Sequence, residues 1–336
     1  MESLDSFSDW EYSGTLPFTI TDPVLSNIGN TPLFPYEERS LSGTVKIKAE
    51  YENPTGSMKD RIAVGMLKEL EENGEIEPGD LVVEGSSGNT AGAVALAANR
   101  LGYECVITTP VGNSEQKLGY VESLGGELIT CPDVPTEHKE YYRNKAKRVA
   151  TERGGVWLDQ YSNQTNPTVH SVWTGPELVD QYPELTHVVC PMGTGGTMSG
   201  IAKYIKEEHN SDVTAIGVDA VESNVSTAFY GHEEGEYNTE VEGLGKGHEL
   251  STMWFDYIDE VRSVPDRDAF LQARRAASQY GLLIGSSSGA ALHIGREIAI
   301  QKPNAEVAVI ACDGGEQYFD TVFDNDWMDE RGYRPQ

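Results

Sequence analysis

Lys59 is the residue of this chain whose type and position point most directly to covalent chemistry. It lies in the segment Asn53–Arg61, and after Gly56 the apolar residues recur on one helical face. Ser57 is the predicted N-cap and Asp60 completes a capping box, so Lys59 falls in the first turn, at the positive end of the helix dipole. A lysine that is also desolvated there has a lowered pKa, and an uncharged amine can form a Schiff base. The alternative is a solvated surface lysine.

A second candidate is the segment Glu84–Ala91, which joins a predicted strand to a predicted helix. It holds four polar side chains, Ser86, Ser87, Asn89 and Thr90, around two glycines. Hydroxyl groups and free backbone N–H groups at the start of a helix form an anion site, and a carboxylate suits such a site. The alternative is a simple capped turn, although four polar side chains are more than capping requires.

A third candidate is the glycine-rich segment 193–200, which also runs from a predicted strand into a helix. Its glycines allow several N–H groups to converge on one phosphate, and Thr194 and Thr197 add hydroxyls. Met198 takes the place of the last glycine of a dinucleotide-binding GxGxxG motif, and no Lys-Ser/Thr pair follows as in a P-loop. The absence of a lysine indicates a phosphate that is held rather than transferred.

Ser287 belongs to a fourth segment, Gly285–Ala291, which opens another predicted helix. A serine hydroxyl can hydrogen-bond a neutral ring nitrogen, whereas an aspartate would keep that nitrogen protonated. The alternative is a serine that only caps the helix. Together, an activated lysine, a carboxylate site, a phosphate-binding loop and a hydroxyl for a ring nitrogen describe pyridoxal phosphate holding an amino acid.

Over roughly residues 24–333, the chain resembles the cysteine synthase and cystathionine β-synthase family. This family is the β-replacement branch of the fold type II pyridoxal-phosphate enzymes. Four motifs carry the resemblance and occur in the family's order: the opening segment Ile28–Leu33, the lysine motif Asn53–Arg61, the asparagine loop Ser86–Ala91, and the segment Gln160–Asn163 with Asn166-Pro167.

The resemblance implies a role for each candidate residue, and it implies pyridoxal 5'-phosphate as the cofactor, with no metal. Lys59 carries the cofactor as a Schiff base, Asn89 bonds the ring hydroxyl oxygen, and Ser287 faces the pyridine nitrogen. The segment Gly243–Gly245 resembles the family's mobile glycine loop near the far end of the substrate. The phosphate is held by Gly193, Thr194, Gly195, Gly196 and Thr197, and the substrate carboxylate by Ser86, Ser87, Thr90 and Gln160.

Some positions depart from the usual pattern of the family. Ala91 replaces a usual glycine and Ser86 a usual threonine, and both changes are small enough to keep the carboxylate site. The segment Ser114–Gly126 lacks the arginine pair common in cysteine synthases. That segment, Asp159–Tyr161 and His170 are more similar to the cystathionine β-synthase pattern. The resemblance therefore defines the cofactor and the reaction class better than it defines the substrate.

The function expected from the resemblance is β-replacement on a serine-type amino acid. The leading interpretation is a cysteine synthase, which converts an O-activated L-serine and sulfide to L-cysteine. The first alternative is a cystathionine β-synthase that uses serine and homocysteine. A serine or threonine dehydratase or a cysteine desulfhydrase, which stops at elimination, is another. A non-catalytic relative that binds a partner or senses an amino acid would need a lost lysine or a broken phosphate loop, and the sequence shows neither.

The elements that must position these residues alternate regularly between strand and helix. This alternation predicts an α/β protein with mainly parallel sheets and helices on both faces, in which binding sites lie at the carboxyl ends of strands. With 336 residues, two domains are expected. The resemblance implies the fold type II, tryptophan synthase β-like architecture. We predict an N-terminal extension over 1–20, a smaller mobile domain over 53–163, and a larger cofactor-binding domain over 21–52 plus 164–336.

Hydrophobic periodicity and glycine stop signals predict the individual elements. The lysine helix is expected to close at Asn73-Gly74, and Glu222–Leu250 is expected to be a surface loop. Strands are predicted over 45–49, 81–84, 104–109, 128–131, 187–190, 213–219 and 307–311. Further helices are predicted over 89–101, 114–124, 136–153, from the 193–200 loop to about 209, and over 265–280 and 288–301.

Composition excludes several classes of function. The formal net charge is −29, from 54 acidic and 25 basic residues spread along the chain, and such a surface repels nucleic acid and anionic membranes. No apolar run is long enough to span a bilayer, and the N-terminus lacks the features of a signal peptide. Four dispersed cysteines without a CxxC pair indicate buried thiols, so a cytoplasmic protein is expected. The resemblance also implies a homodimer, with a small amino acid and a sulfur nucleophile as its partners.

The acidic surface generates a first prediction, that of a salt-adapted (halophilic) protein, with a merely acidic mesophilic protein as the alternative. An excess of 29 negative charges raises the self-repulsion of the compact state, and salt screens that repulsion. The melting temperature should therefore rise as potassium chloride increases from low to molar concentration. A flat or falling curve would contradict salt adaptation.

Overall fold

The structure is a computed structural model that describes residues 10, 13–112, 115–233, 235, 237–248 and 250–334. The chain divides into two compact units. Unit 1 contains the chain up to Gly29 together with Asn53–Asn166, and unit 2 contains Asn30–Glu52 together with Pro167 onward. Each unit is built around its own sheet.

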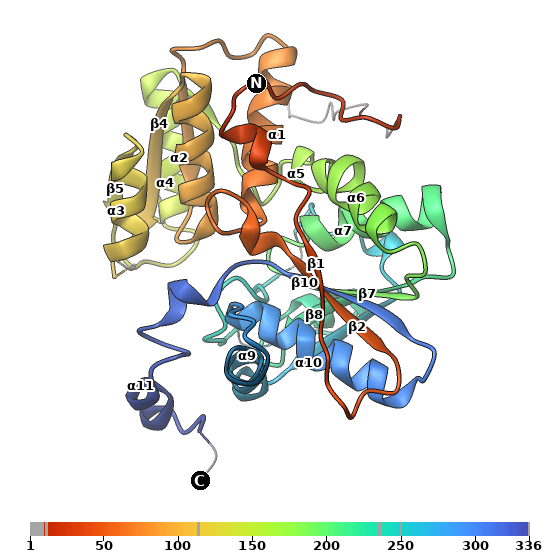
Figure 1. The fold of residues 1–336 in the computed structure, drawn as a ribbon. Helices are drawn as coiled ribbons and strands as arrows, with labels where there is room; N and C mark the ends of the chain where they lie inside the picture. Colours follow the sequence, from red (N-terminus) through yellow and green to blue (C-terminus); the bar gives the residue numbers. More distant parts are fainter. Residues whose placement is uncertain are drawn as a thin grey trace. The chain divides into compact units, whose positions relative to one another are not determined.

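Unit 1 has a four-stranded parallel sheet in the order β5-β4-β3-β6. The chain moves from β3 to β5 in one direction and then returns to β6, so right-handed crossovers put its helices on opposite faces. Accordingly, α2 and α4 lie on either side of β4 (Figure 1). The strands are β3 (Leu81–Gly85), β4 (Glu104–Pro110), β5 (Glu127–Cys131) and β6 (Val156–Trp157), and the helices are α1 (Lys59–Glu72), α2 (Asn89–Leu101), α3 (Glu115–Ser123) and α4 (Tyr142–Arg153).

Unit 2 has a six-stranded sheet in the order β1-β2-β10-β7-β8-β9. All neighbouring strands are parallel except the edge strand β1, which pairs antiparallel with β2. The strands are β1 (Leu33–Pro35), β2 (Thr44–Ala49), β7 (His187–Pro191), β8 (Thr214–Ala220), β9 (Glu260–Val264) and β10 (Glu306–Ala311).

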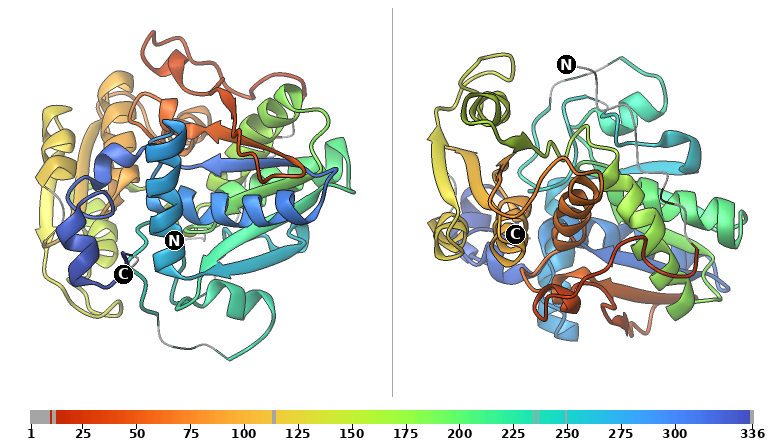
Figure 2. Two further views of the ribbon diagram at one scale, coloured as in Figure 1. Left: turned by 60° about the horizontal axis from the view of Figure 1, so that its bottom comes forward. Right: turned by 90° about the horizontal axis from the view of Figure 1, so that it is seen from above.

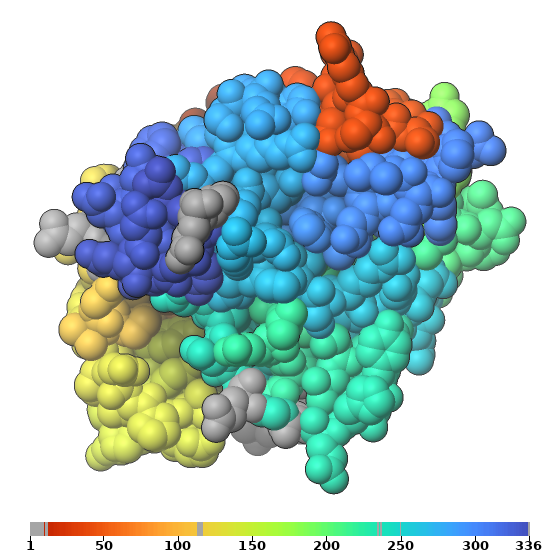
Figure 3. Space-filling model, turned by 90° about the horizontal axis from the view of Figure 1, so that it is seen from below, coloured from red at the N-terminus to blue at the C-terminus, as the bar shows by residue number. Residues whose placement is uncertain are grey.

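The main core of unit 2 lies between this sheet and the helices α9 (Asp266–Tyr280) and α10 (Ser286–Gln301), which contact each other but run in different directions (Figure 2). Val307 and Val309 of β10 face this core, so the alternate residues of the strand face the other side of the sheet. The C-terminal segment lies beside α9 (Figure 3), and Trp327 and Tyr333 meet the Phe270 ring edge-to-face, with 5.6 and 5.0 Å between ring centroids.

The remaining helices of the described chain are short. The α-helices are α5 (Thr165–Val169), α6 (Gly175–Gln181), α7 (Gly196–Tyr204), α8 (Val225–Phe229) and α11 (Asn325–Glu330). The π-helical turns are His170–Thr174 and Ile205–His209, and the 3-10 turns are Leu25–Asn27, Glu50–Glu52, Phe255–Tyr257 and Gly315–Tyr318.

The predicted α/β class and most predicted elements are confirmed. The helix over 89–101 has the predicted bounds, and it ends at Gly102 because this glycine takes φ +86°. The helix predicted over 136–153 is wrong at its start and begins at Tyr142, because two turns come first: His138 N donates to Pro135 O, and Tyr141 N donates to His138 O. The predicted loop 222–250 contains α8, and Ser114 lies outside the described residues. The sequence did not predict β1, β6, β9, α5, α6 or α11.

The hydrogen bonds that a capping box of Ser57 and Asp60 would make at the start of the lysine helix are not those observed, so this prediction is wrong. Ser57 Oγ accepts from the N–H of Lys59 at 3.3 Å, and the N-cap position is Met58. The Asp60 carboxylate reaches instead to Thr55, whose backbone N–H it accepts at 2.8 Å and whose hydroxyl it also accepts. The C-terminus of the helix follows the prediction, with Asn73 as the C-cap and Gly74 at φ +70°.

The two units differ from the predicted domains at the N-terminus. The sequence placed 21–29 with the larger domain, whereas these residues belong to unit 1. The reason is a pair of polar contacts: Arg100 forms a 2.7 Å ion pair with Asp22, and Gly29 N donates to Asn53 Oδ1 at 2.9 Å. Residues 164–166 also belong to unit 1.

Two sequence expectations concern membrane spans and the state of the cysteines. No helix in the described ranges combines the length and the apolar character that crossing a membrane requires. The four cysteines, Cys105, Cys131, Cys190 and Cys312, are all buried and carry no disulfide bond.

The contact between α9 and α10 generates a stability prediction. A Cβ on Gly289 would lie 2.3 Å from the backbone oxygen of Ala269, so Gly289→Ala must push the two helices apart and should cost about 1–3 kcal/mol. Gly119 in α3 has open space around its Cβ position, so Gly119→Ala should gain about 0.5–1 kcal/mol from helix propensity. Denaturant unfolding measures the free energy of unfolding of both variants. Equal changes in the two variants would contradict the close approach of α9 and α10 at Gly289.

Candidate active site

Lys59 is the first residue of α1, as predicted, and the turn before it is tied to the helix. Gly56 takes φ +81°, which glycine adopts without strain. The Ser57 hydroxyl and the Asp60 carboxylate then hold the backbone of Lys59 and Thr55 respectively. Lys59 therefore sits at a helix start whose backbone position is defined by its own neighbours.

The segment Ser86–Thr90 follows β3 and leads into α2. Ser86 N donates to Thr108 O at 3.0 Å, which continues the pairing of β3 with β4. The Ser86 hydroxyl accepts from the N–H of Gly88 at 3.2 Å, and α2 begins at Asn89 with Gly88 as its N-cap. The segment thus lies at a helix start, where the first N–H groups have no acceptor within the helix, and this position is compatible with the predicted anion site.

Gln160 is brought to this segment by the loop after β6. Thr90 Oγ1 donates to Gln160 Oε1 at 2.7 Å, and Asn166 Nδ2 donates to the backbone oxygen of Gln160, also at 2.7 Å. Because Gln160 accepts through its amide oxygen, its amide N–H groups can donate to a carboxylate. Unit 1 thus joins two predicted carboxylate-binding residues that lie 70 positions apart in the sequence.

The predicted phosphate loop Gly193–Thr197 lies between β7 and α7, and its glycines are required by close contacts. Gly195 takes φ +82° immediately before the helix begins at Gly196. A Cβ on Gly193 would lie 2.2 Å from the backbone oxygen of Gly243, and one on Gly195 would lie 2.4 Å from Met253 Cγ. Glycines at a helix start keep the N–H groups accessible to a phosphate, so these residues fit the phosphate of pyridoxal phosphate.

Side chains from other segments of unit 2 support the phosphate loop. Thr252 Oγ1 donates to Thr194 O at 2.6 Å. The Thr197 hydroxyl lies 3.1 Å from Nε2 of the buried His170, whose Nδ1 lies 2.8 Å from Thr174 Oγ1. Residues of two distant segments, Thr252 and His170–Thr174, therefore support the shape of this loop.

The glycine loop Gly243–Gly245 lies against the same segment. Gly245 N donates to Met192 O at 2.8 Å, and Gly243 makes the close approach to Gly193 described above. Both glycines take positive φ, +77° and +70°. The structure thus places the predicted glycine loop beside the predicted phosphate loop within unit 2.

Ser287 is buried in the first turn of α10. The helix begins at Ser286 with Gly285 as its N-cap, so the alternative in which Ser287 only caps the helix is wrong. The neighbouring Asp313 accepts from the Tyr318 hydroxyl at 2.6 Å. Burial raises the pKa of Tyr318 well above its usual value, so its phenol stays neutral and donates.

Sequence reasoning missed several residues that support the candidate loops. Thr252 donates to Thr194 O, and Asp313 O accepts from Gly285 N at 3.0 Å; both contacts arise only through the tertiary fold, and no local spacing in the sequence signals them. Within the described residues, no group of three or more histidine, cysteine or acidic side chains is placed to hold a metal ion.

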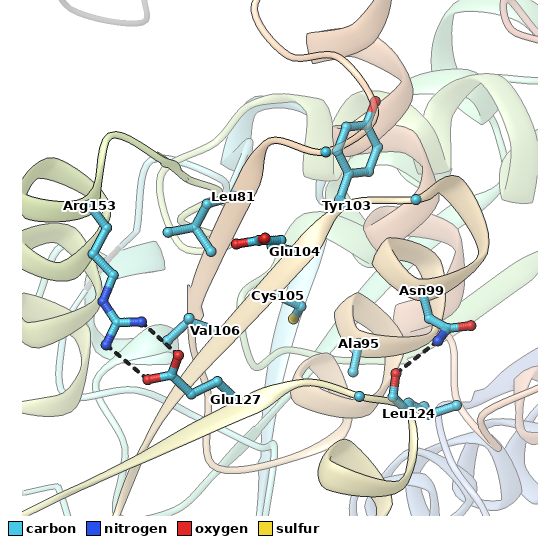
Figure 4. A pocket seen from close by; sticks show the side chains of 13 residues that line it. Leu81, Ala95, Asn99, Tyr103, Glu104, Cys105, Val106, Leu124, Glu127 and Arg153 are labelled. Atoms are coloured by element: carbon cyan, nitrogen blue, oxygen red, sulfur yellow. Dashed lines mark hydrogen bonds and ion pairs between the residues drawn. The ribbon is translucent and has the colours of Figure 1, made fainter.

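A cavity of about 700 Å³ lies in unit 1 at the amino ends of β3, β4 and β5 (Figure 4). An ion pair between Arg153 and Glu127, at 2.6 Å, crosses one side of it. Burial raises the pKa of the lining thiol of Cys105 to about 12, so this cysteine is unreactive. The candidate loops follow the carboxyl ends of strands instead, and none of their residues lines this cavity.

The hydrogen bond from Thr252 generates a prediction for the phosphate loop. Thr252→Val removes the hydroxyl that donates to Thr194 O, and a neutral hydrogen bond contributes about 1 kcal/mol, or roughly fivefold in affinity. Apoprotein of this variant should bind pyridoxal phosphate roughly fivefold more weakly in an absorbance titration. Thr252→Ser keeps the donor and should bind as the wild type does. Equal weakening by both variants would contradict the role of the hydroxyl.

Comparison with known proteins agrees with this geometry. The family model described as pyridoxal-phosphate dependent enzyme matches residues 24–313. A cysteine synthase of Staphylococcus aureus is 34% identical over 309 residues, which cover 89% of this chain and 96% of that protein. A cystathionine beta-synthase of Dictyostelium discoideum is also 34% identical, over 325 residues, which cover 94% of this chain and 64% of that protein.

A solved structure supports the same relationship at the level of the fold. The crystal structure of O-ureido-L-serine synthase matches with a TM-score of 0.84 and 26% identity, over 91% of this chain and 96% of that one. The chain belongs to the pyridoxal-phosphate-dependent enzyme family, in the fold type II branch that contains cysteine synthase and cystathionine β-synthase and carries out β-replacement.

Proposed function

We propose that this enzyme is a cysteine synthase, which replaces the leaving group of an O-activated L-serine by sulfide. The contact between Thr90 and Gln160 carries the proposed β-replacement on an amino acid, because it leaves the amide N–H groups of Gln160 available to a substrate carboxylate. Cysteine synthase relatives matched over 96% of their length support this substrate class.

The proposed roles of the other residues are those that the family resemblance implies. The Lys59 amine holds the cofactor, and when the substrate amine displaces it, it takes the proton from the substrate Cα. Asn89 bonds the ring hydroxyl oxygen. The N–H groups and hydroxyls of the Gly193–Thr197 loop hold the phosphate, supported by Thr252 and His170.

Pyridoxal phosphate, when bound, supplies an electron sink for the charge that develops at the substrate Cα. The Ser287 hydroxyl at the ring nitrogen can donate or accept a hydrogen bond, but it does not enforce a charge there. Ser86, Ser87, Thr90 and Gln160 hold the carboxylate, so they fix the orientation in which Lys59 meets the α-proton. The leaving group on Cβ then departs and the sulfur nucleophile takes its place.

A second candidate function is cystathionine β-synthase, with serine and homocysteine as substrates. Two observations favour it: the chain is 34% identical to the Dictyostelium enzyme and 33% identical to the enzyme of Apis mellifera. The sequence around Asp159–Tyr161 and His170 also resembles that pattern. Both candidates share the same cofactor and carboxylate site, and they differ in the leaving group and in the thiol.

Steady-state assays of the purified protein distinguish the two. Serine, O-acetylserine and O-phosphoserine are each paired with sulfide and with homocysteine. A cysteine synthase should have its highest kcat/KM with an O-activated serine and sulfide. A preference for serine with homocysteine would establish the second candidate, and release of pyruvate or ammonia without a thiol product would establish an eliminating enzyme.

The role of Lys59 is tested in the same preparation. Borohydride should fix the cofactor covalently on Lys59 of the wild type, as mass spectrometry of the peptides would show. Lys59→Ala should lose this attachment and nearly all turnover. Lys68→Ala is the matched control, because Lys68 lies on the same helix and pairs with Glu71 at the surface. Turnover at the native rate in Lys59→Ala would overturn the assignment.

A further inference from the structure

Ser223 and Asn224 form a clamp on the glycine loop, which is taken here as residues 243–247. Both residues lie between β8 and α8 of unit 2, and both are buried. Ser223 Oγ accepts from the N–H of Lys246 at 2.9 Å and donates to Lys246 O at 3.1 Å. One hydroxyl therefore contacts both backbone polar groups of a single loop residue.

Asn224 adds contacts from its backbone and from both atoms of its amide. Its N–H donates to Lys246 O at 2.8 Å, and Nδ2 donates to Gly247 O at 2.8 Å. Nδ2 also donates to Gly235 O at 3.0 Å, and Oδ1 accepts from Gly235 N at 2.8 Å. Asn224 occupies the N-cap position of α8, where an asparagine side chain commonly caps the helix, but its amide serves these loop contacts instead.

The end of β8 keeps the clamp in place. Asp219 is fully buried, and its carboxylate accepts from Ala220 N at 2.9 Å and from Ser226 N at 2.8 Å. One side chain therefore closes the turn that carries the clamp at both ends. Gly245 takes φ +70°, and a Cβ there would lie 2.5 Å from Ser223 Oγ and 3.0 Å from Asp219 Oδ1. Glycine at this position allows the loop to approach the clamp closely.

The glycine loop that the clamp holds also contacts the phosphate loop. Gly245 N donates to Met192 O at 2.8 Å, and Met192 immediately precedes Gly193. A Cβ on Gly193 would lie 2.2 Å from Gly243 O, so the two backbones touch there. Within unit 2, a continuous series of contacts thus leads from the clamp through the glycine loop to the start of the phosphate loop. Displacement of the glycine loop would move the backbone that presents N–H groups to a phosphate.

We propose that Ser223 and Asn224 are positioning residues for the cofactor phosphate: they hold the glycine loop against Met192 and Gly193 and so keep the phosphate loop in the conformation that binds the phosphate. They act through the backbone of Lys246 and Gly247, so the effect depends on the hydrogen bonds of the clamp. This inference rests on the proposed role of the Gly193–Thr197 loop toward the phosphate of pyridoxal phosphate.

The test compares the affinity of the apoprotein for pyridoxal phosphate with its affinity for pyridoxal, which has the same ring and aldehyde but no phosphate. Ser223→Ala removes both contacts of the hydroxyl with Lys246. Its Kd for pyridoxal phosphate should rise roughly fivefold in an absorbance titration, the loss expected for one neutral hydrogen bond, while its Kd for pyridoxal stays at the wild-type value. Ser263→Ala is the matched control, because Ser263 is exposed on β9 and donates to Ser226 Oγ at 3.0 Å. It should leave both Kd values unchanged.

Asn224→Asp tests the second half of the clamp. It keeps an acceptor for Gly235 N but loses the Nδ2 donor to Gly247 O, so it should weaken the binding of pyridoxal phosphate and not of pyridoxal. Asn238→Ala is its control, because the Asn238 amide donates to Glu222 at the surface. Denaturant unfolding shows which variants are folded. Because Ser223→Ala introduces no charge, this variant decides the question if Asn224→Asp does not fold.

The outcomes separate the clamp from the phosphate loop itself. Equal weakening of both ligands in Ser223→Ala, or an unchanged Kd for pyridoxal phosphate, would overturn the positioning role and leave the proposed function in place. A wild-type apoprotein that binds pyridoxal phosphate no more tightly than pyridoxal would overturn the proposed role of the Gly193–Thr197 loop, and the role of the clamp with it.

Discussion

The candidate site depends on backbone N–H groups at the starts of helices, which have no acceptor within their own helix. α2 begins at Asn89 and α7 at Gly196, each directly after a parallel strand, and α10 begins at Ser286. Their three described N-caps are all glycines, and none makes a side-chain capping hydrogen bond. The positive ends of these helices suit anions or polar ligands, as the proposed roles toward a cofactor phosphate and a substrate carboxylate require.

Close backbone approaches keep these helix starts in place. A Cβ on Gly193 would lie 2.2 Å from Gly243 O, and one on Gly200 would lie 2.1 Å from Pro167 O. Gly200 is on the second turn of α7, so the same helix that presents the phosphate loop is packed tightly against the segment before His170. Glycine at these positions serves packing as well as backbone freedom, because any side chain would separate segments that must touch.

The protein buries charge in two contrasting ways. Lys48 is fully buried and has a complete set of partners: the Glu177 carboxylate, Thr31 O at 2.6 Å and Gln181 Oε1 at 2.8 Å. This network connects β2 to α6. Its hydrogen bonds and ion pair offset the free-energy cost of removing the Lys48 charge from water. Oε2 of Glu84 lacks such a partner in the described chain, and burial raises the pKa of this side chain. Burial therefore favours its protonated, neutral form over the ionised form. The first arrangement is structural, and the second is sensitive to pH.

The amino-acid sequence by itself determined the elements and residues that depend on local chemistry. The hydrophobic period placed Lys59 at a helix start, and Gly102 marked the end of the helix predicted over 89–101. Both could be predicted because capping and helix termination act over a few residues. Only the tertiary structure decided that residues 21–29 join unit 1 through Asp22 and Arg100. The contact of Thr90 with Gln160 also belongs to the tertiary structure, because it joins positions 70 residues apart, and contacts across such separations leave no periodic signal in the sequence.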